Sequence, residues 1–184
     1  MRTLVLGGIR SGKSRWAEEA IANSLEPGRP VCYLAPGPSV DGDPEWSERV
    51  ARHRARRPGH WSTVETEDPE DVAAQLVRLT QTPTLVDDLG GWLTATMDRH
   101  DAWDGGSVEA PVAALVDAIG EFESTLMLVS PEVGLTVVPA SKSGRRFADE
   151  LGDLNQRVAA LCDRVVLVVA GQPLTIKPTS PARA

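Results

Sequence analysis

The sequence predicts an α/β fold with a largely parallel sheet flanked by helices. Short runs of leucine and β-branched residues alternate along the chain with amphipathic stretches of helical length, which is the pattern of βα units. Most of these runs lack polar alternation, as expected of strands covered by helices on both faces. The chain has 184 residues, the length of one domain. We therefore predict one domain over residues 1–177, followed by a flexible tail over 178–184.

Six segments are predicted as strands because they are short, apolar and bounded by glycine, proline or polar residues. The first ends at a pair of glycines, and the fourth ends at a pair of aspartates. The stretch after Gln172 contains three prolines and no apolar periodicity, so we expect no regular structure there. The predicted strands are residues 3–6, 31–35, 62–64, 84–87, 126–130 and 165–170.

Six helices are predicted between these strands from their amphipathic periodicity. Two of them begin at an Asp-Pro pair, Asp43-Pro44 and Asp68-Pro69. In each pair the Asp suits the N-cap, and the Pro suits the first helical position because its missing N–H has no partner there. The predicted helices are residues 13–24, 44–57, 69–79, 89–99, 108–123 and 142–161.

Composition and charge limit the kinds of partner. Hydrophobic residues make up 41% of the chain and charged residues 24%, as in ordinary globular proteins. The net charge of −7 would repel nucleic acid and anionic membranes, and no apolar run approaches the ~20 residues that span a bilayer. Cys32 and Cys162 form no metal-binding spacing, which fits a reducing compartment. We expect a soluble cytoplasmic protein that binds neither nucleic acid nor membrane.

A glycine-rich motif joins the first predicted strand to the first predicted helix. The segment Gly7-Gly8-Ile9-Arg10-Ser11-Gly12-Lys13-Ser14 satisfies GxxxxGK[ST], the phosphate-binding loop (P-loop) of NTPases. Glycines let successive backbone N–H groups point at phosphate oxygens, and the following helix contributes its N-terminus. Lys13 is predicted to reach the β- and γ-phosphates, and Ser14 to bind Mg²⁺. The motif therefore predicts a P-loop NTPase-type fold that uses GTP, ATP or both as substrates.

Two acidic residues follow predicted strands at the edge where α/β proteins bind ligands. Asp87 ends the strand 84–87, and we predict that it binds Mg²⁺ or its water, as an acid at this place does in P-loop enzymes. Glu132 follows the strand 126–130 and could hydrogen-bond to the residues that bind the metal or nucleotide. Either acid could instead cap the next helix.

Basic residues surround a histidine on the predicted helix 44–57. Arg49 and Arg56 lie four residues before and three residues after His53, so the three side chains share one face. Such a cluster suits phosphate, and a histidine there would meet it. A solvated helix face with an incidental histidine also explains this spacing, and the spacing alone favours it. Five arginines lie within nine residues: Arg49, Arg52, Arg54, Arg56 and Arg57.

Several segments, taken together and in order over residues 1–177, resemble one enzyme family. They are GGIRSGKS, DPEWSERVARHRARRPGHW, EVGLTVVPAS and RRFADELGDLNQR, the last of them preceding VVLVVAG. The chain resembles the bifunctional adenosylcobinamide kinase/adenosylcobinamide-phosphate guanylyltransferases of cobalamin synthesis. Two patterns are more specific than the P-loop. They are HxxxRPxxW, present as His53, Arg57, Pro58 and Trp61, and GxxNQR, present as Gly152, Asn155, Gln156 and Arg157.

The resemblance implies a two-step enzyme with small-molecule corrinoid and nucleotide substrates. It would phosphorylate the aminopropanol hydroxyl of adenosylcobinamide and then transfer GMP from GTP onto that phosphate, with His53 carrying the GMP in between. The resemblance also implies a homotrimer with its site near the subunit boundaries. The residues that it places around the nucleotide, besides the P-loop, are Leu34, Ala35, Pro36, Arg54, Ala55, Arg56, Arg57, Glu65 and Asp87.

The chain departs from the family pattern at several positions. Pro36 stands in place of a usual Thr, Ala95 in place of an Asn, and Pro131 in place of an Asn before Glu132. The stretch from Asp87 to Gly91, with glycine at 90 and 91, replaces an acid-Cys-hydrophobic-Thr sequence. These changes remove amide and hydroxyl donors that could contact corrinoid or ribose. They leave the residues of the phosphate chemistry in place.

Two other functions compete with this interpretation. One is a GTP-binding switch protein, because residues 87–90 fit a DxxG motif, although the sequence contains no NKxD motif for reading guanine. The other is a small-molecule kinase that uses the P-loop and leaves His53 idle. Covalent labelling by GTP distinguishes this second alternative from the family function.

Overall fold

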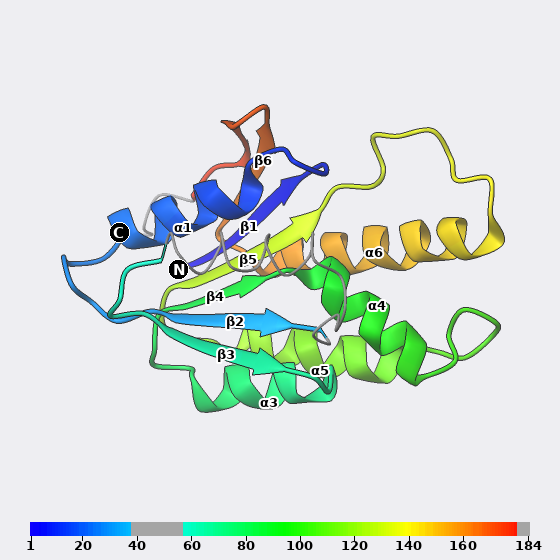
Figure 1. The fold of residues 1–184 in the computed structure, drawn as a ribbon, viewed down its shortest axis with the longest axis horizontal. Helices are drawn as coiled ribbons and strands as arrows, with labels where there is room; N and C mark the ends of the chain where they lie inside the picture. Colours follow the sequence, from blue (N-terminus) through cyan, green and yellow to red (C-terminus); the bar gives the residue numbers. More distant parts are fainter. Residues whose placement is uncertain (38–56, 180–184) are drawn as a thin grey trace.

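The computed structural model describes residues 1–37 and 57–179. They form a seven-stranded sheet with helices on both faces (Figure 1). The α/β class, the largely parallel sheet and the helical layers predicted from sequence are confirmed. In chain order the elements are β1 (Arg2–Gly7), α1 (Lys13–Asn23), β2 (Cys32–Pro36), β3 (Ser62–Thr66), α3 (Glu70–Arg78), β4 (Thr84–Asp87), α4 (Leu89–Arg99), α5 (Glu109–Gly120), β5 (Leu126–Pro131), α6 (Lys142–Leu161), β6 (Arg164–Val169) and β7 (Gln172–Lys177).

The strand order is β3-β2-β4-β5-β1-β6-β7, and every neighbouring pair is parallel except β6 and β7. Strand β5 therefore lies between β1, which leads into the P-loop, and β4, which ends at Asp87. The register pairs Gly7 with Pro131 and Asp87 with Val129. The carboxyl ends of β1, β5, β4 and β2 thus meet at one edge of the sheet, where ligands of α/β proteins bind.

Alternate residues of the strands supply two cores, one on each face of the sheet. On one face Val5, Tyr33 and Leu85 pack with Ala17 and Ile21 of α1. On the other face the opposite set of strand residues packs against α3, α4, α5 and α6, with Trp92 and Leu93 of α4 fully buried. Both faces of the central strands are covered, which explains why the strand sequences lack polar alternation.

Most predicted elements agree with the structure to within a few residues. The strand 84–87 and the helices 89–99 and 142–161 have the predicted bounds, whereas α5 ends at Gly120 instead of residue 123. Helix α3 begins one residue later than predicted, with Pro69 as its N-cap, and Asp68 Oδ1 accepts a hydrogen bond from the Glu70 N–H at 3.0 Å. The predicted helix 44–57 and its Asp43-Pro44 cap lie outside the described residues, apart from Arg57.

The expectation of irregular chain after Gln172 is wrong. Residues 172–177 form β7, which pairs antiparallel with β6 through a turn at Ala170 and Gly171, both at positive φ. Pro173 is tolerated because β7 is an edge strand, where a missing N–H breaks no central ladder. Lys177 then donates hydrogen bonds to the carbonyl oxygens of Ala159 and Ala160 at the end of α6. The tail predicted over 178–184 stays a prediction.

Across residues 1–37 and 57–179, none of the helices has the length and apolarity that crossing a membrane requires.

Candidate functional site

The P-loop wraps around the end of β1 and runs directly into α1 (Figure 1). Gly12, the residue before α1, has a φ of 92°, which favours glycine. A Cβ at Gly7 would lie 2.4 Å from Ser11 Oγ and 2.8 Å from the Val168 carbonyl oxygen, so only glycine fits there. The motif therefore requires glycine at position 12 because of its positive φ, and at position 7 because of close packing.

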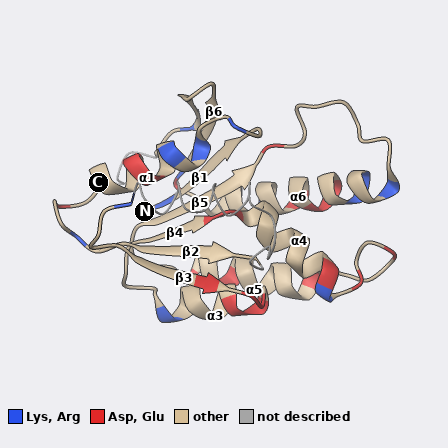
Figure 2. Ribbon diagram, in the orientation of Figure 1, with Lys and Arg blue, Asp and Glu red and all other residues tan. Residues whose placement is uncertain are grey.

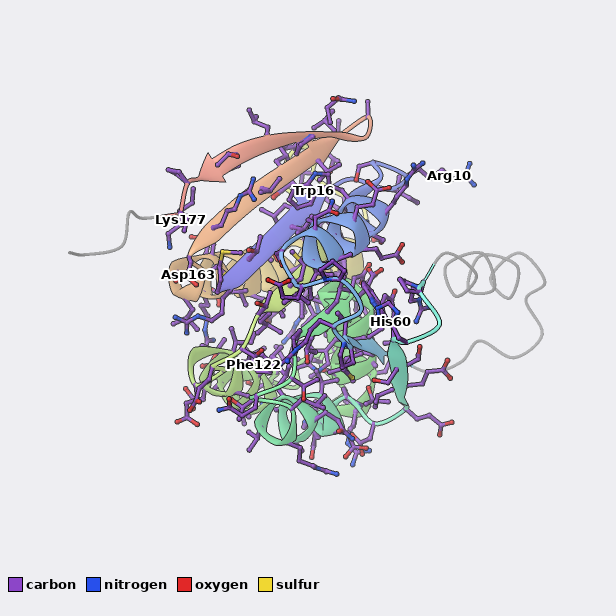
Figure 3. All side chains as sticks on the ribbon, turned by 90° about the vertical axis from the view of Figure 1, so that its left-hand side faces the viewer. Arg10, Trp16, His60, Phe122, Asp163 and Lys177 are labelled. Atoms are coloured by element: carbon purple, nitrogen blue, oxygen red, sulfur yellow. The ribbon has the colours of Figure 1, made fainter. Side chains whose placement is uncertain are left out.

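The turn between β6 and β7 supports the P-loop from one side. The Gly171 N–H donates to the Ser11 carbonyl oxygen at 2.7 Å, and a Cβ at Gly12 would lie 3.2 Å from Gly171 Cα. Arg10, at a φ of 55°, forms the outer tip of the loop and points away from the sheet (Figure 3). Lys13 is only 7% exposed, at the first position of α1. The loop thus has a buried cation at its base.

Ser14 and Asp87 meet at this loop although they are 73 residues apart in sequence. The Ser14 hydroxyl donates to Asp87 Oδ1 at 3.1 Å. The pair joins the start of α1 to the end of β4 across β5. A hydroxyl and a carboxylate oxygen side by side beside a phosphate-binding loop are the hard ligands that Mg²⁺ takes, completed by phosphate oxygens and water. In residues 1–37 and 57–179, no group of three His, Cys, Asp or Glu is arranged to hold a metal alone.

Tyr33 is a site residue that the sequence interpretation missed. It lies on β2, is 4% exposed, and its hydroxyl donates to Asp87 Oδ2 at 2.7 Å. Burial, followed by the nearby Asp87 charge, raises the pKa of the Tyr33 phenol, so the hydroxyl stays a donor. Its sequence signal was weak but present, because Tyr33 is the sole tyrosine of the chain and a buried phenol needs a partner.

Arg57 lies over the ring of Tyr33, with its guanidinium carbon 3.6 Å from the ring centroid. Its Nη1 also donates to Thr63 Oγ1 at 2.8 Å. Thr63 is the register partner of Tyr33 across β2 and β3, so the two contacts fix Arg57 above this strand pair. Arg57 is the last residue of the arginine-rich segment. Tyr33 links Arg57 to Asp87, because the Tyr33 ring contacts the Arg57 guanidinium and the Tyr33 hydroxyl donates to Asp87.

The remaining predicted nucleotide positions fall into two groups. Leu34, Ala35 and Pro36 form the carboxyl half of β2, and Glu65 is the register partner of Ala35 on β3. These residues lie at the same sheet edge as the P-loop. His53, Arg54, Ala55 and Arg56 lie outside the described residues, and so do Arg49 and Arg52.

The other acids at this edge have local roles. Asp88 caps α4, because its Oδ1 accepts a hydrogen bond from the Gly91 N–H at 2.8 Å. Gly90 belongs to the first turns of that helix, so the DxxG stretch begins a helix. Glu132 Oε1 accepts from the Gly134 N–H at 2.6 Å, and the Glu132 N–H donates to the Gly7 carbonyl oxygen at 3.1 Å. Glu132 therefore shapes the turn beside the P-loop and caps no helix.

The GxxNQR segment of α6 reaches the sheet edge through one residue. Asn155 is 7% exposed, and its Oδ1 accepts a hydrogen bond from the Ser130 hydroxyl at 2.6 Å. Its Nδ2 donates to the Pro131 carbonyl oxygen at 3.0 Å. Asn155 thus fixes the end of β5 next to the P-loop. Gln156 bonds within its own helix, and Arg157 pairs with Glu109 at 3.1 Å.

Two departures from the family pattern, Gly90 and Pro131, are in contact. A Cβ at Gly90 would lie 2.6 Å from Pro131 Cγ and 2.9 Å from its Cδ. A proline ring cannot move aside as a flexible side chain can, so Gly90 and Pro131 form one coupled change.

We expect Gly90→Ala to destabilise the protein by about 1–3 kcal/mol, because the added methyl overpacks against the Pro131 ring. Gly91→Ala is the matched control, since its Cβ would meet only ordinary contacts at 3.5 and 3.6 Å. Urea denaturation of both variants measures the difference. Equal stabilities, or full retention of the Gly90→Ala loss in a Pro131→Ala background, would contradict this coupling.

Charge is unevenly spread around the site. Figure 2 shows acidic residues gathered on α3 and the neighbouring end of β3, the outer strand of the sheet on the side away from β1. The P-loop itself contains two cations, Arg10 at its tip and the buried Lys13 at its base, whereas Arg15 on α1 pairs with Glu19 at 2.8 Å. The local basic site expected of an acidic anion-binding protein is therefore present at the loop itself. The acidic group consists of Glu65, Glu67, Asp68, Glu70 and Asp71.

Comparisons with known proteins cover almost the whole chain. A family model described as "Cobinamide kinase / cobinamide phosphate guanyltransferase" matches residues 3–176. The bifunctional adenosylcobalamin biosynthesis protein CobP of Pseudomonas aeruginosa is 43% identical over 181 residues, covering 96% of this chain and 98% of that protein. The corresponding CobU proteins of Escherichia coli and Salmonella typhimurium are 35% and 34% identical, each match covering 96% of this chain and 100% of the relative.

Proposed function

This chain belongs to the cobinamide kinase/cobinamide phosphate guanyltransferase family, and from that membership we propose how its residues carry the two reactions. It is a bifunctional transferase of cobalamin biosynthesis, with a kinase activity and a guanylyl-transfer activity in assembly of the nucleotide loop. The observation that carries our assignment of the site is the Ser14–Asp87 contact at 3.1 Å beside the P-loop.

In the kinase reaction, the P-loop binds the triphosphate through the N–H groups of residues 7–14. The aminopropanol hydroxyl oxygen of adenosylcobinamide attacks the γ-phosphorus, its proton is released to solvent, the bond to the β–γ bridging oxygen breaks, and the nucleoside diphosphate leaves. Lys13 offsets the negative charge that develops on the bridging oxygen. Ser14 and Asp87 would hold Mg²⁺, which, when bound, neutralises charge on the β- and γ-phosphate oxygens.

In the guanylyl transfer, a ring nitrogen of His53 attacks the α-phosphorus of GTP and pyrophosphate leaves. A phosphate oxygen of adenosylcobinamide phosphate then attacks the same phosphorus, and the P–N bond breaks to regenerate the histidine. Two displacements let one site serve two acceptors in turn. Arg57 supports this proposal. It belongs to the same HxxxRPxxW pattern as His53, and Tyr33 connects it to Asp87 through its ring and its hydroxyl.

A product assay tests this function. The protein is incubated with adenosylcobinamide, Mg²⁺ and either ATP or GTP, and the corrinoid products are identified by mass. We expect adenosylcobinamide phosphate from the kinase step, and adenosylcobinamide-GDP only when GTP is present. Phosphate product without any GDP-linked product would instead support a simple kinase.

We expect Asp87→Asn to weaken Mg²⁺-dependent nucleotide binding and kinase turnover by about 10- to 100-fold. Nucleotide affinity in EDTA should change little, because the proposed partner of Asp87 is the ion or its water. Binding of a fluorescent GTP analogue with and without Mg²⁺ measures both. An equal loss in the two conditions would indicate a purely structural acid.

We further propose a homotrimer, as the family resemblance implies, in the reducing environment of the cytoplasm, which the two free cysteines fit. The edge strand β7 supports self-association, because an edge with apolar side chains is a surface for pairing with another chain. Leu174 and Ile176 on β7 are 58% and 56% exposed, and Val169 at the end of β6 is 57% exposed. Light scattering should give a molar mass three times that of the chain. A monomer mass at all concentrations would contradict this assembly.

A further inference from the structure

We propose that Tyr33 is a positioning residue shared by both reactions: its hydroxyl fixes the Asp87 carboxylate, and its ring face holds the Arg57 guanidinium. The inference rests on the proposed function, because it gives one side chain a part in both the metal site and the guanylyl-transfer segment. Each contact is made by a different part of Tyr33, so the two roles can be separated by substitution.

The hydroxyl contact orients the carboxylate. Tyr33 donates to Asp87 Oδ2 at 2.7 Å, while Ser14 donates to Oδ1 of the same group at 3.1 Å. With Oδ2 fixed by Tyr33, Oδ1 faces Ser14 and the P-loop. Removing the phenol hydroxyl would let the carboxylate rotate away from the metal position. Hydrogen-bond partners that orient a metal-binding group in this way typically change metal affinity or activity by 10- to 100-fold.

The ring contact fixes the end of the arginine-rich segment. The Arg57 guanidinium carbon lies 3.6 Å from the centroid of the Tyr33 ring, and Arg57 Nη1 also donates to Thr63 Oγ1 at 2.8 Å. Tyr33 itself is 4% exposed, packed with Val31 and Leu85 in the core beneath α1. A ring embedded in this way is a rigid platform. It sets where the chain lies four residues after His53.

Two variants separate the contacts. Tyr33→Phe keeps the ring under Arg57 and removes only the hydroxyl, whereas Tyr33→Leu removes both. Thr84→Val is the matched control, because it removes a fully buried hydroxyl from the opposite end of β4, where Thr84 donates to the Thr82 carbonyl oxygen at 2.9 Å. Thr84→Val should leave the affinity for a GTP analogue and the rate of GMP incorporation at wild-type values.

The first readout is the affinity for a fluorescent GTP analogue in Mg²⁺ and in EDTA. For Tyr33→Phe we expect about a 10-fold loss of affinity in Mg²⁺ and almost none in EDTA. The second readout is the rate of covalent GMP incorporation from GTP at saturating Mg²⁺, followed by intact mass. Tyr33→Phe should stay within about twofold of wild type, and Tyr33→Leu should be slower by roughly 5- to 30-fold, the range of a partly buried cation–π contact.

Each result decides one part of the proposal. An unchanged Mg²⁺ dependence in Tyr33→Phe overturns the hydroxyl role, and so does an equal loss in EDTA, which a merely structural residue would give. A wild-type incorporation rate in Tyr33→Leu overturns the ring role. If the wild-type protein itself forms no GMP adduct, the proposed function fails and the ring role fails with it, a result distinct from an effect seen only in the variants.

Discussion

Replacing His53 with alanine is expected to leave phosphorylation of adenosylcobinamide in place and to abolish guanylyl transfer. Phosphoryl transfer to a hydroxyl needs the P-loop, the metal and an aligned acceptor, and requires no covalent enzyme intermediate. Guanylyl transfer loses its nucleophile, so its rate should fall by at least about 10⁴-fold. Separate assays of the phosphate product and the GDP-linked product measure the two effects.

The chain offers matched controls for this variant. His60 is an exposed residue on the segment leading into β3 (Figure 3), and His100 lies at the end of α4 with its Nε2 3.4 Å from Glu70 Oε1. His60→Ala and His100→Ala should keep both activities. Arg49→Ala and Arg56→Ala should slow transfer less than His53→Ala, because each removes one phosphate contact and keeps the nucleophile. Retention of transfer by His53→Ala would overturn the histidine assignment.

Replacing Lys13 with alanine is expected to lower both activities by about 10²- to 10³-fold. Lys13 is the buried cation at the base of the P-loop. In the proposed mechanism both reactions use the P-loop to bind the nucleotide phosphates. Its ammonium acts on charge that develops as the β–γ or α–β bond breaks, so the loss should appear mainly in kcat. Steady-state kinetics of the two half-reactions provide the measurement.

Folding must be separated from chemistry in this variant. Lys142, exposed at the start of α6, supplies the control, and Lys142→Ala should behave as wild type. The thermal midpoint of Lys13→Ala should stay close to that of the wild-type protein, because the P-loop backbone bonds do not involve the ammonium. Unchanged turnover in either half-reaction would contradict the assignment of the P-loop to both.

The features that sequence predicted well are those encoded locally. Glycine spacing and the flanking apolar run place the P-loop, because the conformation and close packing at Gly7 and Gly12 require glycine. The position of Asp87 was also predictable from sequence, since an acid at the end of a buried parallel strand lies at the ligand-binding edge of the sheet. Helix α6 was predicted within its bounds from its amphipathic periodicity alone, and the structure adds that the Ser141 side chain caps it by accepting from the Gly144 N–H.

The features that sequence missed depend on which strands become neighbours. Tyr33 reads as one more core residue of a buried strand, and its partner Asp87 lies 54 residues away on β4. Only the β2–β4 pairing brings them together. Strand β7 was missed because prolines argue against a central strand, whereas its place at the sheet edge tolerates them. The Gly90–Pro131 contact likewise joins two segments that are distant in sequence.

The central claim is that one P-loop domain carries GMP on a histidine between two reactions. Its most direct test is intact-mass measurement after incubation with Mg²⁺ and GTP, followed by peptide mapping of the adduct. We predict one GMP per chain on His53, labile in acid, stable in base, and removed by adenosylcobinamide phosphate. No adduct, or an adduct that maps to His60 or His100, would contradict the claim.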